Sequence, residues 1–394
     1  MPQAFSRQLP APTSYKVIYS FGYGKASDGD DPVADLIVRG GKFYGTTQFG
    51  GKTNGRCYLG CGTVFTMSSA GVERVLYRFK GGTDGAAPAA GLIALDGAFF
   101  GTTSGGGAGS QCAGGCGTVF EVSADGKSEK ILHSFSGGSD GATPVATLVA
   151  FRGFLYGATE YGGLTKGSCF SGCGTIFSVS TTGTEKIIYR FKGGKDGAQP
   201  VAPLSATAGV LYGTTQYGGL TTGLCSTGCG TIFRLSASGE KKTLYRFTYA
   251  ARSKDGAYPA AGLLAMHREL YGTTIGGGLL GDGVVFKVNE SSGAETVVHR
   301  FSCCVTTLDG AFPFARLADV NGTIYGTTRA GGAANAGAVF AIDSAGTESV
   351  LYSFQGHPDG AQPQARVTLL SGVLYGTTTG GGSAAEGSVF RLAP

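Results

Sequence analysis

Hydrophobic and polar positions alternate over short stretches of the chain, and the same stretches return at a nearly constant interval. Residues 88–92 read Pro-Ala-Ala-Gly-Leu, and residues 155–159 and 186–191 read Leu-Tyr-Gly-Ala-Thr and Lys-Ile-Ile-Tyr-Arg-Phe. Alternation with a period of two is typical of β-strands. Steps such as Ser-x-x-Gly between these stretches are typical of hairpin turns. The pattern therefore predicts short strands joined by tight turns.

A unit of about 55 residues repeats along the chain. It reads Leu-Tyr-x-Phe, Asp-Gly-x-x-Pro-x-Ala-x-Leu, Leu-Tyr-Gly-Thr-Thr-x-x-Gly-Gly and Gly-Thr-Val-Phe, and three landmarks each occur seven times. The Asp-Gly steps begin at Asp28, Asp84, Asp140, Asp196, Asp255, Asp309 and Asp359. The aromatic residues before Gly-Thr-Thr are Tyr44, Phe100, Tyr156, Tyr212, Tyr271, Tyr325 and Tyr375. Those that end Gly-Thr-Val-Phe are Phe65, Phe120, Phe177, Phe233, Phe286, Phe340 and Phe390.

Each unit has room for four strands. Residues 88–92 show the predicted inner strand, and residues 155–159, 174–179 and 186–191 show the second, third and fourth. Four-stranded units of this length are typical of propeller blades. The sequence therefore predicts an all-β fold, a seven-bladed β-propeller with four antiparallel strands in each blade.

The two ends of the chain are complementary. The chain opens with a lone fourth strand at residues 15–21 and ends on a third strand at residues 387–392. The N-terminal strand can therefore complete the last blade, which closes the ring and removes its exposed edges. We expect residues 15–394 to form a single propeller and residues 1–14 to form a flexible tail.

The repeat resembles a known family. The stretches Leu211-Tyr212-Gly213-Thr214-Thr215, Gly218-Gly219, Gly230-Thr231-Ile232-Phe233 and Leu244-Tyr245-Arg246-Phe247 are similar to the GloVer tandem repeat of bacterial exported and surface proteins of the choice-of-anchor type. The resemblance extends from about Tyr15 to Leu392. It implies export and a propeller-like fold. It implies no known reaction, so no catalytic residues carry over.

Composition and charge exclude several classes of protein. Glycine provides 72 of 394 residues without a three-residue period, and 42% of the residues are hydrophobic, so the chain is neither collagen-like nor disordered. The net charge of +5 includes no basic stripe, which argues against a nucleic-acid partner. No apolar run is long enough for a membrane span. Residues 1–7 contain no signal core, so an export signal is expected outside this sequence. We expect a monomer.

The cysteines predict local disulfides. Four Cys-x-x-x-Cys pairs occupy the same place in units one to four, just before Gly-Thr-Val-Phe, and units five to seven have a shorter connection there without cysteine. The pairs are Cys57/Cys61, Cys112/Cys116, Cys169/Cys173 and Cys225/Cys229, and we interpret each as a staple of its own insertion. A zinc site is the alternative, but zinc usually takes Cys-x-x-Cys pairs and histidine. Disulfides imply an extracellular, periplasmic or cell-surface location. The state of Cys303 and Cys304 stays open.

Residues present in all seven units are interpreted as scaffold. The Asp of each Asp-Gly step is expected to cap its own turn, because a lone carboxylate provides too few oxygens for calcium. The recurring rings are expected to fill the space between blades. His133 and His299 stand where other units have Tyr in Leu-Tyr-x-Phe, so we interpret them as core substitutions.

Positions that vary between units indicate where a ligand would bind. The Asp-Gly loops and the cysteine insertions are predicted to emerge on one face of the ring, and such loops usually carry function. Candidate residues after Gly-Thr-Thr on this face are Gln48, Glu160, Tyr161, Gln216, Tyr217 and Arg329. Rings beside polar groups suit a sugar or a peptide, although ordinary loop variation would look the same.

A second variable set lies between the recurring Ala and Leu of the predicted inner strand. In a closed ring, Arg316, Arg366 and Asp35 are expected to cluster at the channel, with Asp31 close by. An arginine pair can receive a carboxylate or a sulfate, and a structural inter-blade salt bridge is the alternative.

The function predicted from sequence is an exported binding propeller whose ligand is a glycan or a protein. A structural or adhesive surface protein and a polysaccharide lyase are the alternatives. We find no constellation of residues that predicts a catalytic group, a metal site or a cofactor.

Overall fold

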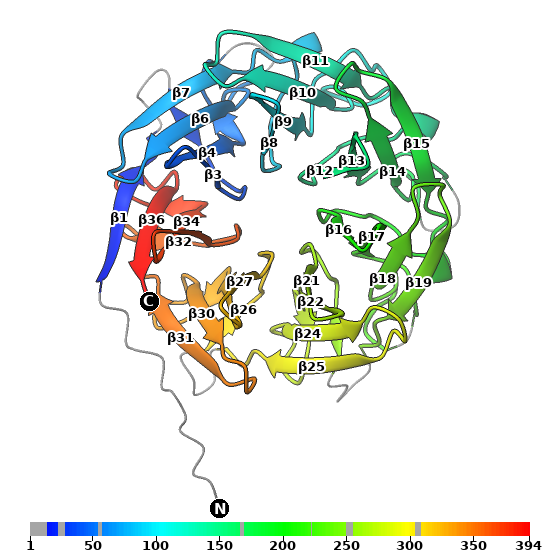
Figure 1. Cartoon of the computed structure of the whole chain (residues 1–394), viewed down its shortest axis with the longest axis vertical. Coiled ribbons are helices and arrows are strands. Elements are labelled where there is room, and N and C mark those ends of the chain that lie inside the picture. Colours follow the sequence, from blue (N-terminus) through cyan, green and yellow to red (C-terminus); the bar gives the residue numbers. More distant parts are fainter. Residues whose placement is uncertain are drawn as a thin grey trace, which may run out of the picture.

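Seven four-stranded antiparallel sheets are arranged as blades around a central axis (Figure 1). The computed structural model describes residues 14–22, 28–53, 57–165, 169–221, 223–249, 255–303 and 309–394. The predicted tail therefore lies outside the described residues, except for Ser14. Within the described part, the fold and the blade number confirm the sequence prediction.

The first four blades share one strand order, running outward from the axis. Blade 1 contains β3 (Ile37–Arg39), β4 (Lys42–Thr47), β6 (Thr63–Ser68) and β7 (Glu73–Arg78). Blade 2 contains β8 (Ile93–Leu95), β9 (Ala98–Thr103), β10 (Thr118–Ser123) and β11 (Glu129–Ser134). Blade 3 contains β12 (Val149–Phe151), β13 (Phe154–Thr159), β14 (Thr175–Val179) and β15 (Glu185–Arg190). Blade 4 contains β16 (Ser205–Thr207), β17 (Val210–Thr215), β18 (Thr231–Leu235) and β19 (Lys241–Arg246).

The remaining blades follow the same order. Blade 5 contains β21 (Leu264–Met266), β22 (Glu269–Thr274), β24 (Val284–Asn289) and β25 (Glu295–Arg300). Blade 6 contains β27 (Ala318–Val320), β28 (Thr323–Thr328), β30 (Ala338–Ile342) and β31 (Glu348–Ser353). Blade 7 contains β33 (Thr368–Leu370), β34 (Val373–Thr378), β36 (Ser388–Ala393) and β1 (Ser14–Ser20).

The ring closes between the two ends of the chain, as predicted. Strand β1 pairs antiparallel with β36, and Tyr15 lies opposite Leu392 (Figure 1). Because β1 supplies the outer strand of blade 7, this blade has the same four strands as the others. The closure leaves no blade incomplete.

The Asp-Gly loops lie beside the loops that follow the second strands. Four short pairings are two-stranded sheets: β2 (Gly29–Asp30) with β5 (Phe49–Gly50), β20 (Gly256–Ala257) with β23 (Gly276–Gly277), β26 (Gly310–Ala311) with β29 (Ala330–Gly331), and β32 (Gly360–Ala361) with β35 (Gly380–Gly381). In the other three units the same pairing is a single bridge. The 3-10 turns η1 (Gly82–Asp84), η2 (Gly138–Asp140) and η3 (Gly194–Asp196) lie in three Asp-Gly loops. Both loop sets therefore share one face.

The prediction for the inner strand was wrong by several residues. Residues 88–92 were expected to form it, but β8 begins at Ile93. The carbonyl oxygen of Ala90 accepts a hydrogen bond from the Thr46 hydroxyl of blade 1 at 2.9 Å. The Pro-x-Ala-x-Leu segment thus bonds to the preceding blade instead of pairing within its own sheet, and it lines the channel.

Phenylalanine pairs form the core between blades. The Phe that ends each Leu-Tyr-x-Phe contacts, edge to face, the Phe of Gly-Thr-Val-Phe in the next blade. The seven pairs are Phe21–Phe65, Phe79–Phe120, Phe135–Phe177, Phe191–Phe233, Phe247–Phe286, Phe301–Phe340 and Phe354–Phe390, with ring centroids 5.0–5.4 Å apart. A Cβ on Gly45 would lie 2.8 Å from the Phe65 ring, which explains the glycine beside each ring. The rings are scaffold, as expected.

Candidate functional site

The Asp of every Asp-Gly step caps its own loop. In blade 7, for example, Asp359 accepts hydrogen bonds from the backbone N–H of Gln355 at 2.9 Å and of Gly360 at 2.7 Å. Each of the other six carboxylates also accepts a backbone N–H from the segment that precedes it. These carboxylates shape the loops of the elaborated face, and the prediction of capping is confirmed.

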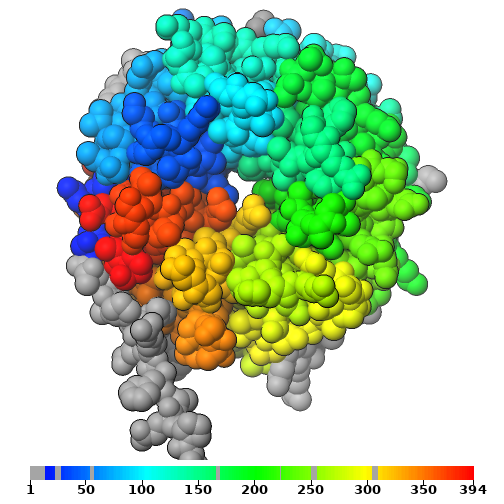
Figure 2. Space-filling model, in the orientation of Figure 1, coloured from blue at the N-terminus to red at the C-terminus, as the bar shows by residue number. Residues whose placement is uncertain are grey.

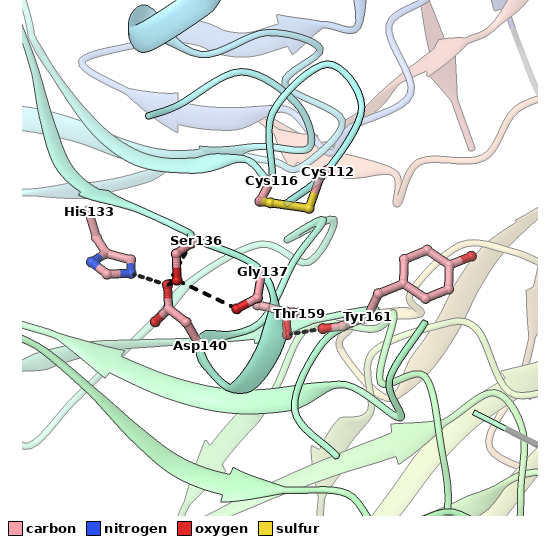
Figure 3. The surroundings of a disulfide bond; sticks show 8 residues. All are labelled: Cys112, Cys116, His133, Ser136, Gly137, Asp140, Thr159 and Tyr161. Carbon is pink, nitrogen blue, oxygen red and sulfur yellow. Dashed lines mark hydrogen bonds and ion pairs between the residues drawn. A yellow bond between two sulfur atoms is a disulfide. The ribbon is translucent and has the colours of Figure 1, made fainter. Parts of the chain in front are cut away.

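Four disulfides close the insertions of blades 1 to 4, and their Cα atoms are 5.1–5.2 Å apart, within the normal range for a disulfide. Figure 3 shows one of them near the Asp-Gly loop of Asp140. Cys303 is also disulfide-bonded, and Cys304 lies outside the described residues. The four bonds have the predicted pairing: Cys57–Cys61, Cys112–Cys116, Cys169–Cys173 and Cys225–Cys229.

The second cysteine of each pair closes its own loop, as predicted, and its backbone also contacts the next unit. The carbonyl of Cys61 accepts the N–H of Ala87 in the next unit at 2.9 Å. The carbonyl of Cys229 accepts the N–H of Tyr258 at 2.8 Å in the same way. The disulfides therefore anchor the insertions at the blade junctions. All four second cysteines have 0% exposure and belong to the hydrophobic core: Cys61, Cys116, Cys173 and Cys229.

One recess on this face lies between blades 3 and 4. It has a volume of about 410 Å³. Four of the predicted ligand residues line it: Glu160, Tyr161, Gln216 and Tyr217. The rest of the lining is Cys169, Gly194, Ala198, Gln199, Gly218 and Thr227. We call this recess the blade 3/4 cleft. The two residues that follow Gly-Thr-Thr or its equivalent in units 3 and 4 therefore lie in the same cleft.

Backbone hydrogen bonds fix the walls of the cleft. The N–H of Gln216 donates to the carbonyl of Gln199 at 2.9 Å, and the N–H of Tyr217 donates to the carbonyl of Ala198 at 3.0 Å. The ring of Tyr217 in turn lies 5.6 Å from the ring of Tyr258. The aromatic and amide groups are therefore held by paired backbone rather than by a loose loop.

Burial and a hydrogen bond set the electrostatics of the cleft. Burial raises the pKa of Glu160, and a hydrogen bond from Tyr161 opposes that rise. Burial and the same hydrogen bond raise the pKa of Tyr161 to about 12. The Tyr161 hydroxyl is therefore protonated at neutral pH and can donate a hydrogen bond to an oxygen atom. The cleft offers two rings, one carboxyl group and two amides.

A second recess lies where blade 7 meets blade 1. Its volume is about 490 Å³, and it is lined by Asp30, Asp31, Phe49, Tyr58, Leu59, Thr379 and Glu386. Burial, with Glu386 beside it, raises the pKa of Asp30 to about 7. Burial also raises the pKa of Asp31 to about 6. Asp31 was expected near the channel arginines, but it lies in this acidic recess.

The channel residues do come together. The backbone N–H of Arg366 donates to Asp35 at 2.7 Å, and the Arg366 Nε lies 3.7 Å from the Asp35 carboxylate. Arg316 reaches Ser205 of blade 4 with its Nη2, at 3.3 Å. Burial and the charge of Arg366 lower the pKa of Arg316. The arginines thus cross-link blades 1, 4, 6 and 7 around an opening that Figure 2 shows at the centre of the molecule.

The remaining predicted residues lie outside the cleft. The guanidinium of Arg329 lies 5.6 Å from the ring centroid of Phe314. The backbone N–H of Gln48 donates to the carbonyl of Asp31 at 3.0 Å. Neither residue lines the blade 3/4 cleft.

The sequence did not identify Gln199, which lines the cleft, or Tyr258, whose ring contacts that of Tyr217. They occupy the variable position just before the recurring Pro, where all seven units have a positive φ: Asp31, Ala87, Thr143, Gln199, Tyr258, Phe312 and Gln362. The N–H of Gln199, for example, donates to the carbonyl of Cys173 in the preceding blade. A variable residue inside an otherwise constant Asp-Gly-x-x-Pro motif was the signal that could have identified them.

Solved structures share the fold at low sequence identity. An oligogalacturonate lyase from Vibrio parahaemolyticus has a TM-score of 0.54 and 10% identity, with 96% of each chain covered. An oligogalacturonate lyase in complex with manganese has a TM-score of 0.53 and 10% identity, with 97% of this chain and 96% of that chain covered. A putative 6-phosphogluconolactonase from Bacteroides fragilis has a TM-score of 0.50 and 16% identity, with 86% and 88% covered. At these identities the likeness shows the fold alone.

No curated protein sequence matches the chain. Among the described residues, no helix is long and apolar enough to cross a membrane. The Gloeobacter/Verrucomicrobia repeat matches residues 5–170 and 163–390, which together span most of the sequence. The chain therefore belongs to the Gloeobacter/Verrucomicrobia repeat family.

Proposed function

We propose that this propeller is an exported carbohydrate-binding protein and that the blade 3/4 cleft is its binding site. The observation that carries the proposal is the meeting of Glu160–Tyr161 and Gln216–Tyr217 in one cleft of about 410 Å³. Tyrosine rings offer apolar area to the faces of a sugar, and carboxyl and amide groups pair with its hydroxyls. A volume of a few hundred Å³ suits a short oligosaccharide.

The channel is less suitable for such a ligand. Its recess has a volume of about 130 Å³, well below that of the cleft, and Arg316 is already bonded across it. Typical ligand pockets have volumes of roughly 300 Å³ or more. A polymeric uronate would therefore have to displace the arginine contacts that join the blades. The channel arginines serve better as an inter-blade cross-link.

The cleft favours binding over hydrolysis. Glycoside hydrolysis usually needs two carboxyl groups on opposite sides of the scissile bond. Among the described lining residues, Glu160 is the one that carries a carboxyl group. Export agrees with the disulfides, which persist in oxidising compartments.

A glycan array with oxidised protein tests the proposal, followed by titration of the best ligand. Tyr161→Ala and Tyr217→Ala are each expected to lower affinity about five- to tenfold, since an aromatic contact contributes about 1 to 1.4 kcal/mol. Gln216→Ala should weaken binding, and Gln48→Ala, at the equivalent repeat position outside the cleft, should not. A blank array would contradict the proposal. So would equal losses for Gln216→Ala and Gln48→Ala.

A further inference from the structure

Each junction between neighbouring blades holds a cluster of three side chains. One is the Asp of the Asp-Gly step, the second is the ring of Leu-Tyr-x-Phe, and the third comes from the outer strand of the next blade. The seven clusters are Tyr19–Asp28–Glu73, Tyr77–Asp84–Glu129, His133–Asp140–Glu185, Tyr189–Asp196–Lys241, Tyr245–Asp255–Glu295, His299–Asp309–Glu348 and Tyr352–Asp359–Tyr15. Two of the seven have histidine in place of tyrosine.

The two histidine clusters share a further residue. Ser136 follows the Phe of one motif and Ser302 follows the Phe of the other. The Ser136 hydroxyl lies 3.1 Å from Asp140 Oδ2, and the Ser302 hydroxyl lies 3.4 Å from Asp309 Oδ2. The same four residue types, His, Ser, Asp and Glu, therefore meet at the junctions of blades 2 and 3 and of blades 5 and 6.

The histidine clusters have dimensions close to those of a metal site. In each one, a histidine nitrogen and two carboxylate oxygens lie within 4.8 Å of one another. The His Nε2 is 3.3 Å from the Asp Oδ2 in both clusters. Ligand atoms on a tetrahedral zinc ion with bonds of about 2.0–2.1 Å are separated by roughly 3.3 Å. The His–Asp pair already has that separation, and the Glu oxygen lies within 4.8 Å of both other ligand atoms.

The glutamates add a second observation. In both clusters, the Glu185 and Glu348 Oε1 atoms are buried and have no hydrogen-bond partner among the described residues. A buried acceptor without a donor is costly, and a cation would satisfy it. The Oε1 atoms of Glu129 and Glu295, in two tyrosine clusters, are in the same position. There the phenol is fixed as a donor, because Tyr77 donates to Asp84 and Tyr245 donates to Asp255. An imidazole can instead present a lone pair to an ion.

Solvent can reach both clusters. The side chains of His133 and Asp140 are 20% and 21% exposed, and those of His299 and Asp309 are 21% and 10% exposed. Figure 3 shows His133 directed at Asp140, with the Cys112–Cys116 disulfide nearby. Both histidines take the place of the junction tyrosine, as interpreted from sequence, but they are partly exposed rather than core residues. The exposure gives an ion an entry path.

We propose that His133–Asp140–Glu185 and His299–Asp309–Glu348 are two equivalent sites for a divalent transition-metal ion of the zinc type. One imidazole nitrogen and two carboxylate oxygens provide three ligands, and a water or the neighbouring serine hydroxyl occupies the fourth position. Each ion would bind residues from two blades. The competing interpretation is that the histidine only replaces tyrosine as the hydrogen-bond partner of Asp.

Tag-free, chelator-treated protein titrated with zinc tests the proposal, with bound metal measured by calorimetry and by elemental analysis after gel filtration. We expect two zinc ions per chain, one for His133→Tyr and none for His133→Tyr/His299→Tyr. These variants restore the residue that the other five junctions carry, so they should fold. Tyr245→Phe, at a tyrosine junction, should still bind two.

Zinc should also raise the melting temperature of the wild-type protein and leave that of the double variant unchanged. Glu185→Gln should weaken one of the two sites by more than tenfold. Failure of the wild-type protein to retain zinc at micromolar concentrations would overturn the proposal. Unchanged zinc stoichiometry in the double variant would do the same and would leave histidine as a hydrogen-bond substitute for tyrosine.

Discussion

Blades 1 to 4 and blades 5 to 7 use the same scaffold but differ in their loops. The Phe pairs between blades have nearly identical geometry in both regions: Phe135–Phe177 has a centroid separation of 5.0 Å and Phe301–Phe340 one of 5.2 Å. The Cys-x-x-x-Cys insertions between the second and third strands occur in the first region alone. The blade 3/4 cleft lies there as well. The difference indicates that constant residues form the ring and that the added loops and variable positions form the cleft.

The largest expected effect tests whether the scaffold is equivalent in both regions. Phe177→Ala and Phe340→Ala each remove a fully buried ring, and each should lower the free energy of unfolding by about 3–5 kcal/mol. Denaturant unfolding followed by circular dichroism measures both. If one substitution lowered the free energy of unfolding by less than half as much as the other, the two blade junctions would not be equivalent.

Removing a disulfide should affect the first region and its site. Cys169→Ser/Cys173→Ser opens a loop of the cleft wall and should cost about 2 kcal/mol of stability. Glycan affinity should fall as well, since Cys169 lines the cleft. The matched variant Cys57→Ser/Cys61→Ser should cost similar stability and leave affinity unchanged. Loss of affinity in both variants would show that the effect is global.

The junction of blades 7 and 1 should make stability depend on pH. The pKa of Asp30 is raised to about 7 in the folded protein, against about 3.9 when unfolded, so the folded state holds a proton that the unfolded state releases. Stability should therefore be highest at low pH within this window and fall by at least about 1 kcal/mol between pH 4 and 7. Asp30→Asn should make the curve shallower, and the remaining slope comes from other carboxyl groups with a raised pKa, such as Glu129 and Glu295. An unchanged pH profile in this variant would contradict the assignment.

The smallest expected effect concerns a ring of hydrogen bonds between blades. In six units a Thr hydroxyl donates to the recurring Ala carbonyl of the next blade, as Thr327 does to Ala365 at 3.1 Å. Blade 3 has Ala158 at that position. Ala158→Thr should add about 1 kcal/mol of stability, and Thr327→Ala should remove a similar amount. Melting curves of the two variants measure both, and a destabilising Ala158→Thr would contradict the equivalence of the blades.

The sequence predicted the repeated features well because repetition averages out local ambiguity. Seven copies of each landmark gave the blade number, and the complementary ends gave the closure between β1 and β36. The inner strand was misplaced because Pro-x-Ala-x-Leu alternates like a strand, yet Ala90 bonds to a Thr of another blade. Alternation reports which side chains are buried, and it does not identify the partner of a backbone group.

The cysteine pairs show the same limit. Their spacing was enough to predict each bond, because the two sulfurs are close along the chain. It did not reveal that Cys61 and Cys229 are fully buried and that their carbonyls bond to the next unit. Contacts between units depend on how neighbouring blades pack, and the spacing within one unit carries no information on that.

The candidate site was predicted only in part. Position in the repeat identified Glu160, Tyr161, Gln216 and Tyr217, which share the cleft, and also Gln48 and Arg329, which lie elsewhere. Which blades form a cleft depends on which loops approach one another, and the sequence of a single repeat does not determine that. The histidine clusters were missed because their carboxylates are about forty residues apart and meet only across a blade junction.

Hydrogen exchange with and without the best-bound glycan tests most directly the proposal that ligand binding takes place in the blade 3/4 cleft. We predict slower exchange in residues 160–163, 194–199 and 216–218, with no change in the equivalent loops at 275–278, 329–332 and 379–382. Protection of the channel segments around Asp35, Arg316 and Arg366 instead, with the cleft unchanged, would contradict the account.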